Sequence, residues 1–247
     1  MRLFHFVKLQ LYYLKLWCGA LLRYPHYSLS PESGLDYDLY WQSKRGDQVG
    51  ALSDWQKERA DMVVASLDSH TKISIGDIGC GDGSILKYLK EHLRVTASVG
   101  YDGSDVALQK ARAIGISAVK LNVAVEEELQ RIEESDYLLL FEVLEHIPHS
   151  EKLLSVAYKK ARKGVFFSIP NSGYFTHRLR LLLGKSPAQW RVYPNEHLRF
   201  WTRTDLKWWL HAQGYNNFRV VGYKGIPVLN RLWPNLFAAG LFVYIKK

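Results

Sequence analysis

The sequence predicts an α/β fold built on a doubly wound, mostly parallel sheet, and three observations support this fold class. Between residues 73 and 169, short apolar or β-branched runs alternate five times with amphipathic segments, which is the pattern of strands joined by helical crossovers. A glycine-rich turn follows the first run, as expected where a strand leads into a helix beside a ligand. The run over 136–141 is almost continuously apolar, as in a central parallel strand covered on both faces. With 247 residues, 47% of them hydrophobic, the chain can bury one main core, so we expect one main domain.

The expected elements follow one another in a regular order. A helix over 55–67 has apolar residues at helical spacing and leads into the first strand at 73–78. Four further strands are predicted over 95–101, 117–121, 136–141 and 164–169. The helices between them are predicted over 84–93, over 104–114, around Val125, Leu129 and Ile132, and beyond Pro148.

The charges are unevenly distributed along the chain, whose net charge is +9. Residues 46–158 contain 11 Lys and Arg against 19 Asp and Glu, whereas residues 159–247 contain 16 against two. This asymmetry favours an anionic partner near the C-terminal third, and a solvated basic face is the simpler interpretation. Only two cysteines are present, which excludes a disulfide scaffold and a cysteine-based zinc site and fits the cytoplasm. We predict no metal site from the sequence.

Residues 1–35 are interpreted as an aromatic and basic amphipathic helix followed by a linker. The segment 3–22 is mostly apolar, but Lys8 and Lys15 interrupt it, which argues against a transmembrane span. Its polar residues line up on one helical stripe, as in helices that lie on the inner face of a membrane. A helix packed on its own domain or on a second subunit explains the pattern equally, and the oligomeric state stays open.

The glycine-rich turn carries the first chemical signal. Gly79, Gly81 and Gly83 are spaced as Gly-x-Gly-x-Gly, whereas a dinucleotide-binding turn requires Gly-x-Gly-x-x-Gly and so a glycine in place of Ser84. Asp77, two residues upstream, would repel a pyrophosphate but can accept hydrogen bonds from an ammonium group.

A second carboxylate stands at the predicted tip of the next strand. Asp102 can accept hydrogen bonds from both hydroxyls of a ribose, so the ligand is predicted to be a nucleoside. In a doubly wound sheet, ligands bind at the carboxyl ends of the strands. We therefore expect the glycine turn, Asp102, Asn122, Glu142 and the Pro170-Asn171 pair to meet in one crevice.

These motifs together resemble a known family. Residues 77–83 (DIGCGDG), then Asp102, then residues 141–147 (FEVLEHI) are similar in order and spacing to the class I S-adenosylmethionine-dependent methyltransferases. Residues 170–174, 177–184 and 197–206 resemble the MetW-like branch. The resemblance covers about residues 40–245, and we take 36–247 as the methyltransferase domain. It implies a Rossmann-like, seven-stranded sheet that ends in an antiparallel C-terminal hairpin, with strands at 217–223 and 236–245.

The resemblance also implies S-adenosylmethionine as the cofactor and assigns its contacts. Gly79, Gly81 and Gly83 would approach the amino acid moiety, with Asp77 near its ammonium. Asp102 would hold the ribose hydroxyls, Asn122 would lie near the adenine amine and Glu142 below the sulfonium.

For catalysis and the methyl acceptor, the sequence offers candidates only. His146 and His197 are the candidate general bases, should the acceptor have to lose a proton. The segment 172–200 is predicted to be a basic, acceptor-side insertion, in which Leu179, Leu182 and Leu183 form the apolar stripe of a packed amphipathic lid. The candidate acceptor-binding residues within it are His177, Arg178, Arg191 and Arg199.

The expected reaction is methyl transfer to an anionic small-molecule, glycan or lipid-linked acceptor, and two alternatives stay open. A MetW-like protein can be the non-catalytic partner of an acyltransferase in methionine biosynthesis, but the N-terminal extension and the segment 233–237 depart from that branch. An RNA methyltransferase would explain the basic residues. The absence of a recognisable RNA-binding module and the dispersed aromatic residues argue against nucleic acid.

Overall fold

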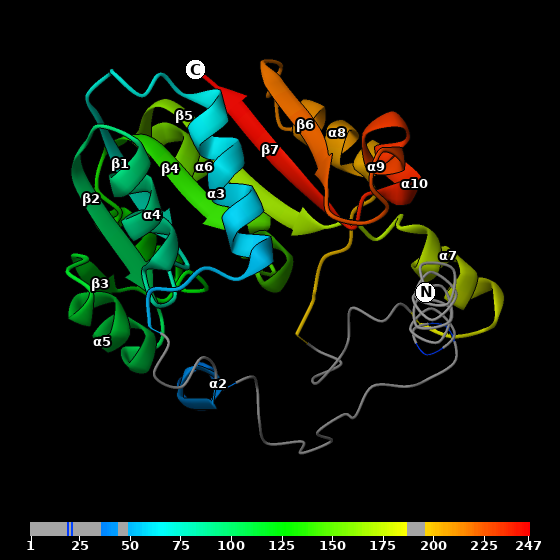
Figure 1. Cartoon of the computed structure of the whole chain (residues 1–247), viewed down its shortest axis with the longest axis horizontal. Helices are drawn as coiled ribbons and strands as arrows, with labels where there is room; N and C mark the ends of the chain where they lie inside the picture. The colour runs from blue at the N-terminus through cyan, green and yellow to red at the C-terminus, as the bar shows by residue number, and fades with distance from the viewer. Residues whose placement is uncertain (1–18, 20, 22–35, 44–48, 187–195) are drawn as a thin grey trace, which may run out of the picture.

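The computed structural model describes residues 19, 21, 36–43, 49–186 and 196–247 (Figure 1). Most of the predicted helix over 3–22, the linker that follows it and Arg191 lie outside these residues. None of the helices in the described part of the chain is long and apolar enough to cross a membrane.

The described residues form one seven-stranded sheet with the order β3-β2-β1-β4-β5-β7-β6. All neighbouring strands are parallel except β7, which pairs antiparallel with both β5 and β6. The predicted doubly wound sheet with an antiparallel C-terminal hairpin is therefore confirmed. The strands are β1 (Ile73–Ile78), β2 (Val95–Asp102), β3 (Ala118–Lys120), β4 (Ser135–Phe141), β5 (Ala161–Pro170), β6 (Phe218–Tyr223) and β7 (Gly240–Lys246).

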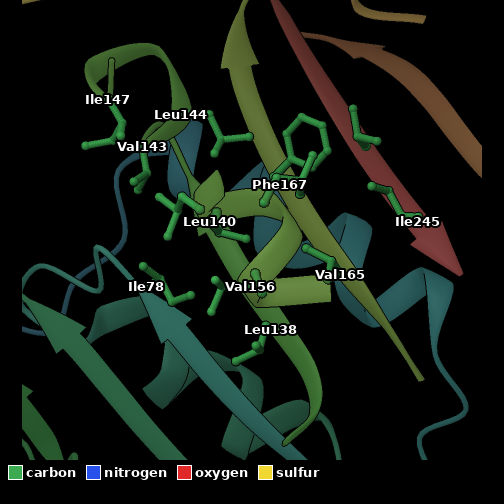
Figure 2. Close-up of a cluster of buried hydrophobic side chains, with 14 of the residues drawn as sticks. Ile78, Leu138, Leu140, Val143, Leu144, Ile147, Val156, Val165, Phe167 and Ile245 are labelled. Atoms are coloured by element: carbon green, nitrogen blue, oxygen red, sulfur yellow. The ribbon is translucent and has the colours of Figure 1, made fainter. Parts of the chain in front are cut away.

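Helices cover both faces of this sheet (Figure 1). On one face lie α3 (Asp54–Ser66), α4 (Ser84–His92) and α5 (Asp105–Ala113), whose buried residues join one apolar cluster. The 3-10 helix η1 (Glu126–Arg131), α6 (Ser150–Lys160) and α8 (Arg203–Ala212) supply the cluster on the other face. Leu138, Leu140 and Phe167 lie at the centre of this second cluster (Figure 2). Two separate cores explain why β4 is apolar on both sides.

The remaining described helices are short and lie near the ends of the strands. They are α2 (Tyr37–Ser43), the 3-10 helix η2 (Leu144–His146), α7 (Phe175–Leu182), α9 (Leu229–Leu232) and α10 (Pro234–Phe237). In Figure 1, α2 lies apart from the sheet on the side towards which β1, β2 and β4 point. This is the edge at which a doubly wound fold binds its ligand.

Three expectations about elements are corrected. The strand predicted from 236 begins at Gly240, because Pro234 starts the short helix α10, a position that suits proline. The helix predicted around Leu129 is a 3-10 helix. The leucine stripe of α7 does not pack as a lid: Leu182 is 82% exposed, whereas Arg180 is 1% exposed. The Arg180 guanidinium donates to the carbonyl oxygens of Ser186 and Leu21, at 2.7 and 3.2 Å, which explains why this polar face of α7 turns inward.

Candidate functional site

The glycine turn lies between β1 and α4 and is fixed to the neighbouring strand by main-chain hydrogen bonds. The amides of Gly79 and Cys80 donate to the carbonyl oxygen of Tyr101, at 2.7 and 3.0 Å. Gly79 has φ +77°, and a Cβ there would lie 2.5 Å from Cγ2 of Val143. Only glycine fits a turn with this conformation at this distance from its neighbour. Gly81 and Gly83 also have positive φ values.

Asp77 lies within β1, directly before this turn, and is 1% exposed. Among the described residues, none donates a hydrogen bond to its buried Oδ2. Burial, with Asp102 nearby, raises the pKa of Asp77 to about 8. An unpaired carboxylate oxygen beside a glycine turn is suited to bind a cationic group.

Asp102, at the end of β2, has two main-chain partners. The amide of Gly81 donates to Oδ2 at 2.8 Å and the amide of Ser104 to Oδ1 at 2.9 Å. Burial raises the pKa of this carboxyl group, and the main-chain hydrogen bonds oppose the rise. A carboxylate has further lone pairs, so Asp102 can still accept from two hydroxyls. The structure thus joins the glycine turn to the second predicted carboxylate.

Asn122 follows β3 and is exposed. The adjacent amide of Leu121 donates to the carbonyl oxygen of Asp102 at 2.9 Å, which places Asn122 beside that strand end. Its own side-chain oxygen accepts from the amide of Ala124 at 3.0 Å. In this structure Asn122 shapes its own turn, and its contact with an adenine stays a prediction.

Glu142 follows β4 and has the positive φ value of 56°, which is uncommon for a residue with a side chain. Its Oε1 accepts from the Ser168 hydroxyl at 2.7 Å and from the Tyr223 hydroxyl at 3.1 Å. The same oxygen lies 3.1 Å from Nη1 of Arg59, whose side chain is only 8% exposed. The sequence analysis missed Arg59 and Tyr223, because they come from α3 and β6 and carry no motif.

His146 and His197, the two predicted bases, lie together, with ring centroids 4.7 Å apart. Burial, with His146 nearby, lowers the pKa of His197 to about 4. His197 is therefore neutral at pH 7, but it is a weak base. Glu145 lies with them, and ligand atoms of the three side chains fall within 4.8 Å of one another. The sequence analysis gave Glu145 no role.

Two of the predicted acceptor-binding residues, Arg178 and Arg199, make hydrogen bonds to main-chain carbonyl groups of the protein. His177 and Arg178 lie on α7, where Nε of Arg178 donates to the carbonyl oxygen of Gly173 at 2.7 Å. Arg199 donates to the carbonyl oxygen of Pro148 and pairs with Glu151 at 3.0 Å. These bonds give Arg199 a structural role at the start of α6, in addition to any contact with an acceptor.

Helix α2 contributes groups that the sequence analysis also missed. The Asp38 carboxylate accepts from the Ser104 hydroxyl at 2.6 Å and from the amide of Val106 at 3.2 Å, which attaches α2 to the start of α5. The Trp41 indole lies against Gly81, in the space that a Cβ would need. Partial burial, together with Glu196, Asp102 and Glu145, raises the pKa of Tyr37 to about 12. The acids of both parts of the crevice thus lie near one hydroxyl of α2.

The geometry fits the cofactor that the resemblance implies. The three glycines of the turn have positive φ values, and the free Oδ2 of Asp77 offers an acceptor to an ammonium group. Asp102 stands at the next strand end, where a ribose would be expected. S-adenosylmethionine carries an ammonium and a ribose diol, so the residues present match its polar groups.

Comparisons with known proteins agree with this geometry. A profile of the methyltransferase domain family matches residues 51–220. The chain is 24% identical over 187 residues to the mitochondrial ubiquinone biosynthesis O-methyltransferase of Candida albicans. That match covers 70% of this chain and 55% of the relative, so the chain spans about half the length of the curated relative it matches.

Two solved structures illustrate the shared fold. An S-adenosylmethionine-dependent methyltransferase of Archaeoglobus fulgidus is 18% identical, with a TM-score of 0.54, over 78% of this chain and 98% of the other. The small RNA methyltransferase HEN1 is 21% identical, with a TM-score of 0.59, over 80% of this chain and 26% of the other. At these identities the likeness concerns the fold alone.

Proposed function

Because the chain belongs to the methyltransferase domain family, we propose that it transfers a methyl group from S-adenosylmethionine to a hydroxyl group of a small anionic acceptor. It is an S-adenosylmethionine-dependent methyltransferase, and the nature of the acceptor is the new part of this proposal. The observation that carries the cofactor assignment is the free, buried Oδ2 of Asp77 beside a turn that requires glycine.

Two features support a hydroxylated, anionic acceptor. The relative matched in Candida albicans is, by its name, an O-methyltransferase. The C-terminal part of the chain, which supplies α7 and the segment around His197, contains 16 Lys and Arg against two Asp and Glu over 159–247. A lipid-linked or glycan acceptor is compatible with both features. Contact with a membrane surface through residues 3–22, on the cytoplasmic side, belongs to the same proposal.

The proposed chemistry needs the protein mainly for positioning. When bound, S-adenosylmethionine supplies an electrophilic methyl group, whose bond to sulfur breaks with the electron pair left on sulfur as the acceptor oxygen bonds to carbon. Asp77 would hold the ammonium, Asp102 the ribose hydroxyls, and the glycine turn the main chain of the amino acid moiety. Arg59 and Tyr223 hold Glu142 in place beneath this site. The acceptor's proton must leave, and His146 or His197 would accept it.

The first test is calorimetric titration of the full chain with S-adenosylmethionine and S-adenosylhomocysteine, with NAD as the control ligand. We expect micromolar binding of the first two and none of NAD. Asp77→Asn should weaken S-adenosylmethionine binding, whereas Asp68→Asn, on an exposed loop, should not. Equal affinity of both variants would remove Asp77 from the site.

The second test identifies the acceptor. Tritium transfer from methyl-labelled S-adenosylmethionine is followed into small-molecule, lipid, glycan and RNA fractions of a cell extract. We expect label in the small-molecule or lipid fraction, in a form stable to mild base, as ethers are and esters are not. Label in RNA would overturn the acceptor class. Cofactor binding without any labelling would favour the MetW-like role as partner of an acyltransferase.

A further inference from the structure

Glu145, His146 and His197 form a compact group, here called the EHH cluster, at the end of β4. Ligand atoms from all three side chains lie within 4.8 Å of one another. Oε1 of Glu145 is 3.8 Å from Nε2 of His146, and the His146 and His197 rings meet edge to face. Two imidazoles and one carboxylate thus converge from two segments that are far apart in the sequence.

Glu145 is buried in a way that calls for a positively charged partner. Its side chain is only 2% exposed. Within the described ranges, neither of its carboxylate oxygens accepts a hydrogen bond. Burying a carboxylate without a partner costs several kcal/mol, and proteins normally pair such a group or use it to bind a metal ion.

The hydrogen bond made by Nδ1 of His146 determines that Nε2 is the ring nitrogen available as a metal ligand. Nδ1 lies 2.8 Å from the carbonyl oxygen of Glu196, and because a carbonyl can only accept, Nδ1 carries the proton. In the neutral ring, Nε2 then presents its lone pair to the Glu145 carboxylate. A ligating histidine typically donates its other N–H to a backbone carbonyl in this manner.

Main-chain hydrogen bonds hold the two segments of the EHH cluster in register. The amides of Leu198 and Arg199 donate to the carbonyl oxygen of Glu145, at 2.8 and 3.0 Å. The Arg199 guanidinium adds bonds to the carbonyl oxygen of Pro148. His197 is therefore placed against His146 by bonds that involve neither imidazole, so the group is preorganised.

We propose that the EHH cluster binds one divalent cation of the first transition series, through Nε2 of His146, a ring nitrogen of His197 and the Glu145 carboxylate. The two imidazoles favour such an ion over Mg²⁺ or Ca²⁺, which prefer oxygen ligands. Three protein ligands leave coordination positions for an exogenous oxygen.

A shared proton explains the geometry less well than a cation does. A hydrogen bond between Glu145 and His146 would require a distance well below the observed 3.8 Å. Two ligand atoms that each lie about 2.1 Å from a metal are about 3.0 to 3.8 Å apart, depending on the angle between them.

The role of this cation rests on the proposed function, although its binding does not. Glu145 and His146 follow β4, which pairs with β1, the strand that carries Asp77, so the EHH cluster lies at the same edge of the sheet as the cofactor crevice. A cation there would bind the acceptor's hydroxyl oxygen and lower its pKa, so that the proton leaves to water before the oxygen bonds to the methyl carbon. An acceptor with two adjacent oxygens, such as a catechol or vicinal diol, would fill two open positions. This gives the reaction an alternative to His197 as a general base.

The experiment is Mn²⁺ binding to the chelator-treated full chain, followed by electron paramagnetic resonance. We expect one bound Mn²⁺ per chain, with spin-echo modulation from imidazole nitrogen, and persistence of the signal in excess Mg²⁺. Glu145→Gln and His197→Ala should each weaken Mn²⁺ binding by at least about tenfold. His149→Ala, outside the EHH cluster, should bind Mn²⁺ like the wild type.

Folding and cofactor binding are measured on the same variants, so failure of the metal site can be distinguished from failure of the proposed function. A wild-type chain that binds S-adenosylmethionine but no Mn²⁺, Co²⁺ or Zn²⁺ at millimolar concentration would overturn the metal site and leave the proposed function standing. Mn²⁺ binding with no S-adenosylmethionine binding would overturn the proposed function and leave the metal site standing. Bound Mn²⁺ without nitrogen modulation, or with equal affinity in folded Glu145→Gln, would also overturn the assignment.

Discussion

Four acidic residues lie at neighbouring strand ends in two pairs, Asp77 with Asp102 and Glu142 with Glu145. In each pair, one carboxylate is held by neighbouring groups of the protein and the other is not. Asp102 and Glu142 are held by the protein: main-chain amides donate to the first, and Ser168, Tyr223 and Arg59 surround the second. Asp77 and Glu145, the other members of the two pairs, are not held in this way. In the part of the chain that the structure describes, no donor reaches Oδ2 of Asp77 or either oxygen of Glu145.

The surroundings of the two unpaired carboxylates differ, and this difference indicates different ligands. Asp77 lies two residues before a glycine turn, at the strand end where an organic ammonium is proposed to bind. Glu145 faces two imidazoles, a combination that suits a metal ion. The comparison indicates that a buried carboxylate oxygen left without a donor marks a ligand position, whereas a carboxylate held by the protein can support the fold as well as a ligand.

The largest expected effect is a dependence of stability on pH that originates at Asp77. Its pKa is about 8 in the folded chain against an ordinary value of 3.8. The folded state therefore binds this proton more tightly, so the stabilisation is fully present below pH 3.8 and is lost as the pH rises through 8. At about 1.4 kcal/mol per pH unit, the wild type should lose roughly 6 kcal/mol of unfolding free energy over that window through this group.

Urea unfolding of the wild type and Asp77→Asn across pH 5 to 9 would measure this effect. The stability gain of the variant should grow with pH, and saturating S-adenosylmethionine should reduce the slope of the wild type, because an ammonium favours the ionised carboxylate. Parallel pH curves for the two proteins would show that Asp77 is already paired.

The next largest effect tests the carboxylates that are held by the protein. Glu142→Ala leaves Arg59 buried without its carboxylate, so the unfolding free energy should fall by about 3 kcal/mol. Glu145→Gln, by contrast, should cause no loss in the metal-free protein. Lys57→Ala, which breaks an exposed ion pair with Asp61, serves as the control and should change stability little. Equal losses for Glu142→Ala and Glu145→Gln would contradict the division between paired and unpaired carboxylates.

A smaller effect separates cofactor binding from folding at Asp102. Asp102→Ala removes the proposed acceptor for the ribose hydroxyls and should weaken S-adenosylmethionine binding by about 2 kcal/mol, or roughly thirtyfold. Asp105→Ala, three residues further on at the start of α5, should leave the affinity unchanged. Calorimetric titration of both variants provides the measurement, and an unchanged affinity for Asp102→Ala would exclude the ribose contact.

The sequence predicted the half of the site whose parts are close together along the chain. Gly79, Gly81 and Asp102 follow their strands directly, and strand and helix periodicity located those strands, so the crevice could be anticipated. Asp77 was predicted beside the glycine turn from its place in the sequence, whereas its burial is a finding of the structure.

The other half depends on contacts between distant segments, which no local pattern encodes. Arg59 reaches Glu142 from α3, and His197 reaches Glu145 through main-chain hydrogen bonds made by its neighbours. The inward turn of Arg180 depends on carbonyl groups outside α7. Helical periodicity could only describe α7 as a leucine stripe, and that prediction was wrong because tertiary hydrogen bonds fixed the other face.

The smallest expected effect concerns whether two hydroxyls that donate to the same carboxylate can compensate for each other. The hydroxyls of Ser168 and Tyr223 both donate to Oε1 of Glu142, and both side chains are buried. Ser168→Ala or Tyr223→Phe should each lower the unfolding free energy by about 1.5 kcal/mol, because a hydrogen bond to a charged group is lost while Arg59 still pairs with Glu142. Since each hydroxyl can compensate for the loss of the other, the double variant should lose about 0.5 kcal/mol or more beyond the sum. Strict additivity in this double-mutant cycle would mean that the two donors act independently and that neither compensates for the loss of the other.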